Sequence, residues 1–164
     1  MTDSKLQIRP ALVQDIPLLL SLVGELAEFE KLAHEAVATH EDFERELFGS
    51  NKSAEAVIAE YEGATVGFAL FFTNFSTFLG KRGLYLEDLF VRPAFRSRGF
   101  GEALFRHLAS LAVARGCGRF EWSVLDWNEN ALRFYRRLGA VSMSDWTVHR
   151  LTGETLERLS RDRV

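Results

Sequence analysis

Two adjacent carboxyl side chains, Glu87 and Asp88, lie within the apolar segment LYLEDLFV at positions 84–91. In a β-strand, alternation would place Glu87 on one face with Leu89 and Asp88 on the other with Leu86. Because both faces of a central strand are normally covered, each carboxylate needs a hydrogen-bonding or charged partner, or a functional role. We expect Asp88 to be structural. For Glu87 we favour a role as general base, because burial would raise its pKa towards neutral pH.

The segment that follows this strand is suited to binding phosphate. It has the pattern R-x-x-G-x-G, formed by Arg96, Gly99 and Gly101. Glycine lets a backbone approach a ligand closely, and the first N–H groups of a helix that starts here are unpaired at its positive end. Arg96 and Arg98 add positive charge. The pattern is neither a P-loop nor a dinucleotide fingerprint. The loop alone is equally consistent with a turn that binds no ligand.

A third group lies in the segment WNENALRFYRRLG at positions 127–139. Its apolar residues recur at helical spacing, so Tyr135 is first of all expected to be a core aromatic residue facing the sheet. A buried tyrosine hydroxyl still requires a polar partner, which leaves Tyr135 usable as an acid.

The elements that must position these groups alternate between strand and helix patterns. We expect a mixed α/β domain over residues 1–164. The expected strands are 6–9, 56–60, 65–72, 84–91, 119–125 and 146–151, with a loop over 75–83. The first expected helix starts with Asp15 as its N-cap. Further helices are expected over 39–48, 100–115 and 128–138, the last with Asn128 as its cap, and a short one from about 153.

Composition narrows the classes of function. The net charge of −3 argues against general nucleic-acid binding, and no apolar run is long enough to span a bilayer. The single cysteine, Cys117, and an N-terminus without an apolar core fit a soluble cytoplasmic protein. The four histidines lack the spacing of metal ligands, so we expect no metal. Nine acidic residues crowd positions 12–48 and six arginines positions 92–119, which could attract a cation and a polyanion.

Together these residues resemble the GNAT superfamily of N-acetyltransferases, and within it the spermidine/spermine (diamine) N-acetyltransferase group. The superfamily's phosphate-loop pattern is Q/R-x-x-G-x-G/A. The narrower resemblance extends over most of the chain, in the segments IRPA (8–11), ELAEFE (25–30), LYLEDLFV (84–91) and WNENALRFYRRLGA (127–140).

The resemblance implies a fold, an activity and site residues. The fold is a central, mostly antiparallel mixed β-sheet flanked by helices, and the activity is transfer of acetyl from acetyl-CoA to a small cationic amine. Glu87 would help to deprotonate the amine and Tyr135 would protonate the departing thiolate. The cofactor-binding residues would be Leu89, Phe90, Val91, Arg96, Ser97, Arg98, Gly99, Phe100, Gly101, Glu102 and Asn128. The substrate-binding residues would be Phe29, Glu30, Glu87, Glu121, Trp122 and Ser123. A homodimer formed through the C-terminal region is implied as well.

Three alternatives remain open from the sequence. Within the same class, thialysine or a related lysine analogue competes with spermidine as acceptor. A protein or peptide acetyltransferase would need an open groove, whereas the loops at 33–39 and 75–81 look suited to covering a small pocket. A non-catalytic acyl-CoA sensor would not need both Glu87 and Tyr135.

Overall fold

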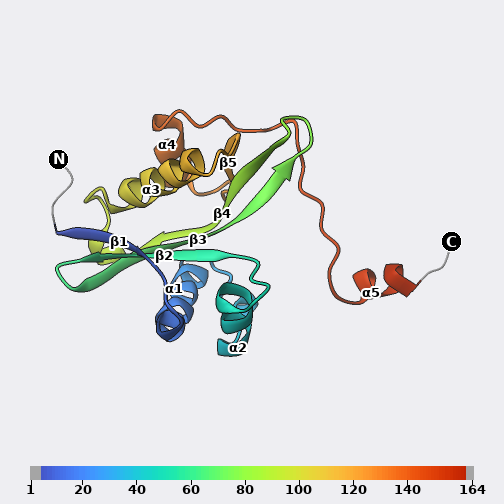
Figure 1. The fold of residues 1–164 in the computed structure, drawn as a ribbon, viewed down its shortest axis with the longest axis horizontal. Helices are drawn as coiled ribbons and strands as arrows, with labels where there is room; N and C mark the ends of the chain where they lie inside the picture. Colours follow the sequence, from blue (N-terminus) through green and yellow to red (C-terminus); the bar gives the residue numbers. More distant parts are fainter. Residues whose placement is uncertain (1–4, 162–164) are drawn as a thin grey trace. The chain divides into compact units, whose positions relative to one another are not determined.

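The computed structural model describes residues 5–161, and it divides the chain into two compact units, Met1–Ser123 and Val124–Val164. The first unit contains one five-stranded sheet with the order β1-β2-β3-β4-β5. Every neighbouring pair is antiparallel except β4 and β5, which run parallel (Figure 1). The strands are β1 (Leu6–Pro10), β2 (Glu55–Tyr61), β3 (Ala64–Ser76), β4 (Lys81–Val91) and β5 (Arg119–Trp122). The predicted mixed sheet is therefore confirmed.

Helices cover both faces of this sheet (Figure 1). One face carries α1 (Ile16–Phe29) and the short α2 (His40–Phe43), which continues as a wider turn over Glu44–Phe48. The other face carries α3 (Phe100–Ala114), which connects β4 to β5. On the α1 face the core includes leucines of α1 and the buried Phe68 and Phe90 of the sheet. Both helices reach the end of β4: Gly101 at the start of α3 lies beside Val91, and Glu25 of α1 pairs with Arg92, the residue after the strand.

Turn chemistry sets the register of the central hairpins. β2 and β3 are joined by Glu62 and Gly63, whose φ angles of 49° and 81° give the left-handed backbone of a tight two-residue hairpin turn. Further along β3, a side chain at Gly67 would collide with the carbonyl oxygen of Phe90. Glycine at this position therefore allows β3 and β4 to approach closely just before β4 ends.

The most consequential irregularity of the sheet is a bulge in β4. Leu86 is paired with Phe71 and Asp88 with Leu70, so Glu87 has no partner in β3. A bulge of this kind reverses the alternation of side chains beyond it. The expectation that Leu86 and Asp88 share a face is therefore wrong. Asp88 lies on the α1 face, whereas Leu86 lies on the α3 face.

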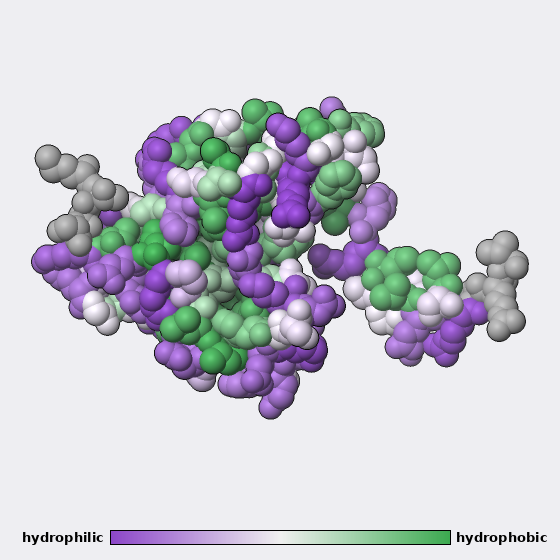
Figure 2. All heavy atoms as spheres, viewed as in Figure 1, coloured by the Kyte–Doolittle hydropathy of each residue, from purple (hydrophilic) through white to green (hydrophobic). Residues whose placement is uncertain are grey.

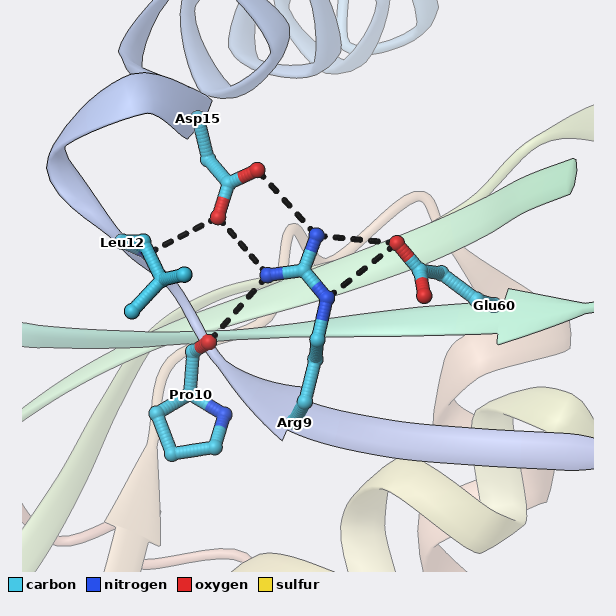
Figure 3. A network of polar contacts seen from close by, with 5 residues as sticks. All are labelled: Arg9, Pro10, Leu12, Asp15 and Glu60. Atoms are coloured by element: carbon cyan, nitrogen blue, oxygen red, sulfur yellow. Dashed lines mark hydrogen bonds and ion pairs between the residues drawn. The ribbon is translucent and has the colours of Figure 1, made fainter. Parts of the chain in front are cut away.

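A partly buried charge network fastens β1 and the start of α1 to the sheet (Figure 3). Arg9 of β1 donates from both terminal nitrogens to the carboxylate of Asp15, at 2.7 and 3.1 Å, and from Nη2 to Glu60 of β2 at 2.8 Å. Asp15 occupies the predicted N-cap position of α1, but its side chain accepts the Leu12 N–H instead of capping the helix. Its pKa is lowered chiefly by the hydrogen bond from Arg9.

The second unit contains α4 (Glu129–Arg137) and α5 (Gly153–Arg161). Asn128 caps α4 as predicted, by accepting the Ala131 N–H, and Gly139 follows the helix with a φ of 88°. The predicted strand 146–151 is wrong, because this segment is irregular and exposed. Within the α5 segment, apolar and polar atoms gather on opposite sides (Figure 2), and Leu156 and Leu159 are exposed.

Two other boundaries differ from the sequence prediction. The expected loop at 75–83 is largely strand, because β3 runs to Ser76 and β4 starts at Lys81. The expected strand 119–125 ends early, at Trp122. Among residues 5–161, no helix combines the length and apolar character needed to cross a membrane.

Candidate active site

The carboxyl-terminal half of β4 has one strand neighbour where the first half has two. β5 is paired with β4 only from Gly83 to Leu86. The Arg92 N–H donates to the carbonyl of Val66 in β3. Because backbone groups in an antiparallel strand point alternately to the two sides, the N–H and C=O groups of Leu89 and Val91 point away from β3. This edge of β4 can therefore hydrogen-bond a ligand, whereas the groups of Phe90 face β3.

The predicted phosphate loop follows directly from this edge. After a short 3-10 turn at Pro93–Phe95, Ser97 and Gly99 have positive φ angles of 60° and 82°, and α3 begins at Phe100. Gly99 is the N-cap and provides no side-chain oxygen, so the first N–H groups of α3 remain available to an anion. At Gly101 an added Cβ would meet only Val91, at 3.8 Å, which explains why the pattern allows alanine there.

The two arginines of the loop have different surroundings. The guanidinium of Arg98 lies over the rings of Tyr61, at 4.6 Å, and Phe100, at 5.0 Å. Arg96 instead reaches back from the loop, and its Nε donates to the carbonyl of Val91 at 2.9 Å. The loop therefore combines free helix N–H groups with two positive charges, as phosphate binding requires.

Three carboxylates face one another near the bulge. Burial is the main cause that raises the pKa of Asp88 to about 6, and the charges of Glu87 and Glu30 raise it further. Burial also raises the pKa of Glu30, at the end of α1. Glu87 is exposed, so its expected burial is wrong, and the carboxylate that burial affects is Asp88. Such a cluster attracts a cation and has a member that can exchange protons near neutral pH.

A sharp helix end positions the residues expected to contact the amine. α1 ends with the Lys31 N–H donating to Glu28 and the Leu32 N–H to Ala27, and Lys31 has a φ of 63°. These paired bonds form a Schellman motif with a non-glycine residue in the left-handed position. The chain turns away at once, which leaves Phe29 and Glu30 at the tip of α1 beside β4.

An ion pair fixes this end of α1 to the strand. Arg92, the residue after β4, donates to the carboxylate of Glu25 in α1 with its closest distance at 2.8 Å, and also to the carbonyl of Thr65. The sequence alone does not predict this pair. The acidic segment and the arginine-rich segment indicated opposite charges, but the fold decides which two residues meet.

The expected acceptor residues at the end of β5 and just after it have partners of their own. Glu121 forms an ion pair with Arg119 at 2.7 Å. The Ser123 hydroxyl bonds to that of Tyr85 at 2.8 Å. Trp122 packs edge-on against Phe105 of α3, with ring centroids 4.7 Å apart. This ring therefore contributes to the core on the α3 face, and the role of the three residues in substrate binding stays a prediction.

Two expected site residues lie in the second unit. At the start of α4, Asn128 uses its side-chain oxygen to cap the helix, which leaves the amide nitrogen as the group that could donate to a ligand. Tyr135 is half-buried and contacts the ring of Phe134 at 5.2 Å. Their roles beside Glu87 stay predictions. In the described part of the chain, His, Cys, Asp and Glu form no group of three that could hold a metal ion.

The acetyltransferase (GNAT) family model matches residues 23–140, which include the second half of α1, the strands from β2 to β5, α3 and α4. The chain belongs to the GNAT acetyltransferase family. A thialysine N-epsilon-acetyltransferase of Mus musculus is 34% identical over 165 residues, covering 94% of this chain and 96% of that protein. An L-ornithine N5-acetyltransferase of Arabidopsis thaliana is 43% identical over 121 residues, covering 74% of this chain. The match spans only 50% of that protein's length.

Solved structures agree with the GNAT fold. An integron cassette protein from the mobile metagenome of V. cholerae superposes with a TM-score of 0.82 at 24% identity, over 98% of this chain and 100% of that one. At this identity the similarity bears on the fold alone. Membership of the GNAT family makes the chain an N-acetyltransferase. The amine acceptor has to be inferred from the site.

Proposed function

We propose that this GNAT enzyme transfers acetyl from acetyl-CoA to a terminal primary amine of a small diamine, polyamine or diamino acid. The observation that carries the proposal is the free edge of β4, which leads from a cluster of carboxylates at Glu87 and Asp88 into the loop at Gly99. Along one strand, this arrangement offers a site for a cation, hydrogen-bonding groups for an extended chain and a site for phosphate. Relatives that act on thialysine and L-ornithine support an acceptor with two amino groups.

The cofactor would lie along the edge and the loop. Leu89 and Val91 offer backbone groups to the pantetheine arm, and one of their N–H groups would polarise the thioester carbonyl. The N–H groups at the start of α3, together with Arg96 and Arg98, would hold the pyrophosphate. Asn128 would donate a further hydrogen bond near the acetyl group.

The amine must be bound as a cation and then discharged, because a protonated amine is not a nucleophile. Glu30 and Asp88 would attract the ammonium group, and Glu87 would accept its proton, directly or through water. The nitrogen lone pair then attacks the thioester carbonyl, the C–N bond forms and the C–S bond breaks. Tyr135 would give its proton to the leaving thiolate. A second ammonium group of the acceptor would stay charged against the carboxylates of α1.

The test is acetyl-CoA-dependent thiol release with a panel of spermidine, putrescine, thialysine, L-ornithine, lysine, an aminoglycoside and a basic peptide. Turnover with diamines or diamino acids that is lost in Tyr135→Phe, while CoA binding persists, supports the proposal. CoA binding without turnover of any member would favour a sensor. Turnover of the peptide alone would favour a protein acetyltransferase.

We also propose that the enzyme is a cytoplasmic homodimer. The second unit exposes many apolar side chains for its size: Val141, Met143, Trp146, Val148, Leu151, Leu156 and Leu159. A second copy of the chain could cover such a surface. Light scattering of the purified protein should give twice the monomer mass of 18.6 kDa, and Trp146→Glu should reduce it. A monomeric wild type would refute this assembly.

A further inference from the structure

Arg96 belongs to the phosphate loop, yet its guanidinium lies against the tip of α1. Its Cζ atom is 4.5 Å from the centre of the Phe29 ring and 5.5 Å from that of Phe90. Its Nε donates to the carbonyl of Val91 at 2.9 Å. One side chain therefore touches the helix of the acceptor side and the strand of the cofactor side.

The surroundings of Arg96 determine how much the contact with Phe29 contributes to the orientation of its guanidinium. Arg96 is exposed as a residue, but the Phe29 and Phe90 rings cover one side of its guanidinium, and this partial burial lowers its pKa. In the described residues no carboxylate pairs with Arg96, unlike Arg92, which is held by Glu25. A guanidinium over an aromatic face gains most when it is partly desolvated. The Phe29 ring, the more distant Phe90 ring and the Val91 carbonyl are thus the groups that fix its orientation, and its terminal nitrogens remain available to an anion.

We propose that Phe29 is a positioning residue for acetyl-CoA, which acts by holding Arg96 in place and so couples the acceptor site to the cofactor site. The inference rests on the proposed function, since it takes the loop as the pyrophosphate site and α1 as a wall of the amine site. It assigns Phe29 a second role, because a residue that only lines the amine pocket should not influence CoA.

The coupling has a consequence in both directions. If binding of the amine moves the Phe29 ring, the affinity for acetyl-CoA changes, and acetyl-CoA must change the affinity for the amine by the same factor. Phe29 is about 40% exposed, so it can respond to a ligand and tolerates substitution without collapse of the core.

The decisive experiment is calorimetric titration of CoA into the enzyme without any amine. Phe29→Leu removes the ring and should raise the Kd for CoA about threefold to tenfold, as expected for loss of a partly desolvated cation–π contact. Phe29→Tyr keeps the ring and should bind like the wild type. In an Arg96→Gln background, Phe29→Leu should have no further effect. The titration stoichiometry and the melting temperature report whether each variant is folded.

Each outcome is informative. If the wild type does not bind CoA, the proposed function itself fails. If the wild type binds and Phe29→Leu binds equally well, the coupling is refuted while the proposed function stands. An equal loss on replacing Phe29 in the wild-type and the Arg96→Gln backgrounds would show that the ring acts without the arginine, and would also overturn the inference.

Discussion

The two halves of β4 differ in how many strands they pair with. From Gly83 to Leu86 the strand is paired on both sides, and Leu84 and Leu86 are almost fully buried. From Glu87 to Val91 it is paired on one side only, and it carries the carboxylates. The first half provides stability because its backbone and side chains are all satisfied within the fold. The second half is the proposed site, because some of its backbone groups have no partner within the sheet.

The bulge at Glu87 marks the change between the halves. It turns Asp88 towards the α1 face, where burial and neighbouring charges raise its pKa. Substitutions on the two sides of the bulge should therefore affect different properties of the enzyme.

The largest effect is expected on catalysis, from a substitution in the half of β4 that pairs only with β3. Glu87→Gln should lower kcat about 100- to 1,000-fold, because loss of a general base typically costs this much. Its melting temperature should stay within about 2 °C of the wild type, since Glu87 is exposed. Steady-state kinetics and thermal unfolding check both, with Glu41→Gln in the acidic segment as a matched control. Unchanged kcat in Glu87→Gln would shift the role of base to Asp88.

A loss of stability with unchanged cofactor binding is expected in the half of β4 that pairs with both β3 and β5. Leu84 is 1% exposed, and Leu84→Ala should lower the free energy of unfolding by about 2–5 kcal/mol. Chemical denaturation measures this loss. The fraction that stays folded should have the wild-type KM for acetyl-CoA, because Leu84 precedes the free edge. A selective rise in this KM without loss of stability would mean that the two halves are not separable.

Ionisation of Asp88 should make the stability of the fold depend on pH. Its pKa rises from 3.8 in a free aspartate to about 6 in the fold, so the folded state disfavours the ionised form. The residue therefore lowers stability as pH rises from about 4 to 6. Asp88→Asn should be more stable than the wild type by about 1–3 kcal/mol at pH 7–8, and the difference should vanish near pH 4.

Denaturation at several pH values tests this sign. The Asp42→Asn variant is the control, because the pKa of Asp42 is lowered to about 2 by hydrogen bonds at its helix cap. That variant should lose stability at neutral pH instead. A loss of stability in Asp88→Asn at pH 8 would mean that the carboxylate has a stabilising partner.

The smallest effect concerns the helix end beside the site. Lys31 adopts a left-handed backbone that costs a side-chain-bearing residue energy, so Lys31→Gly should stabilise the fold by about 0.5–1 kcal/mol. Lys31→Ala, which keeps the Cβ, should not. Equal stabilities of the two variants, measured by denaturation, would show that the Schellman end is not strained.

Patterns local in sequence predicted much of this molecule. The strands at 56–60 and 84–91, the helix at 100–115 and the cap at Asn128 each depend on neighbouring residues, and the structure contains them as β2, β4, α3 and the start of α4. The loop that we expect to bind phosphate lies between β4 and α3, where a strand followed by a helix was predicted for the same reason. The family also followed from the sequence, because its motifs occur in the expected order.

Features that depend on distant partners could not be predicted in this way. The bulge at Glu87 results from the register between β3 and β4. The sequence therefore predicted burial of Glu87, whereas Asp88 is the more buried of the two. The ion pair between Glu25 and Arg92 joins segments far apart in the sequence. The segment 146–151 has a strand-like pattern but finds no strand partner among the described residues.

The most direct test of the free edge is residue-resolved hydrogen exchange with and without CoA. The amide protons of Leu89 and Val91 should exchange readily in the free enzyme and become protected when CoA is bound. Those of Tyr85 and Leu86, in the half paired on both sides, should be protected in both states. Protection of Leu89 and Val91 that does not change at saturating CoA would contradict the account, because the edge would then not be the cofactor site.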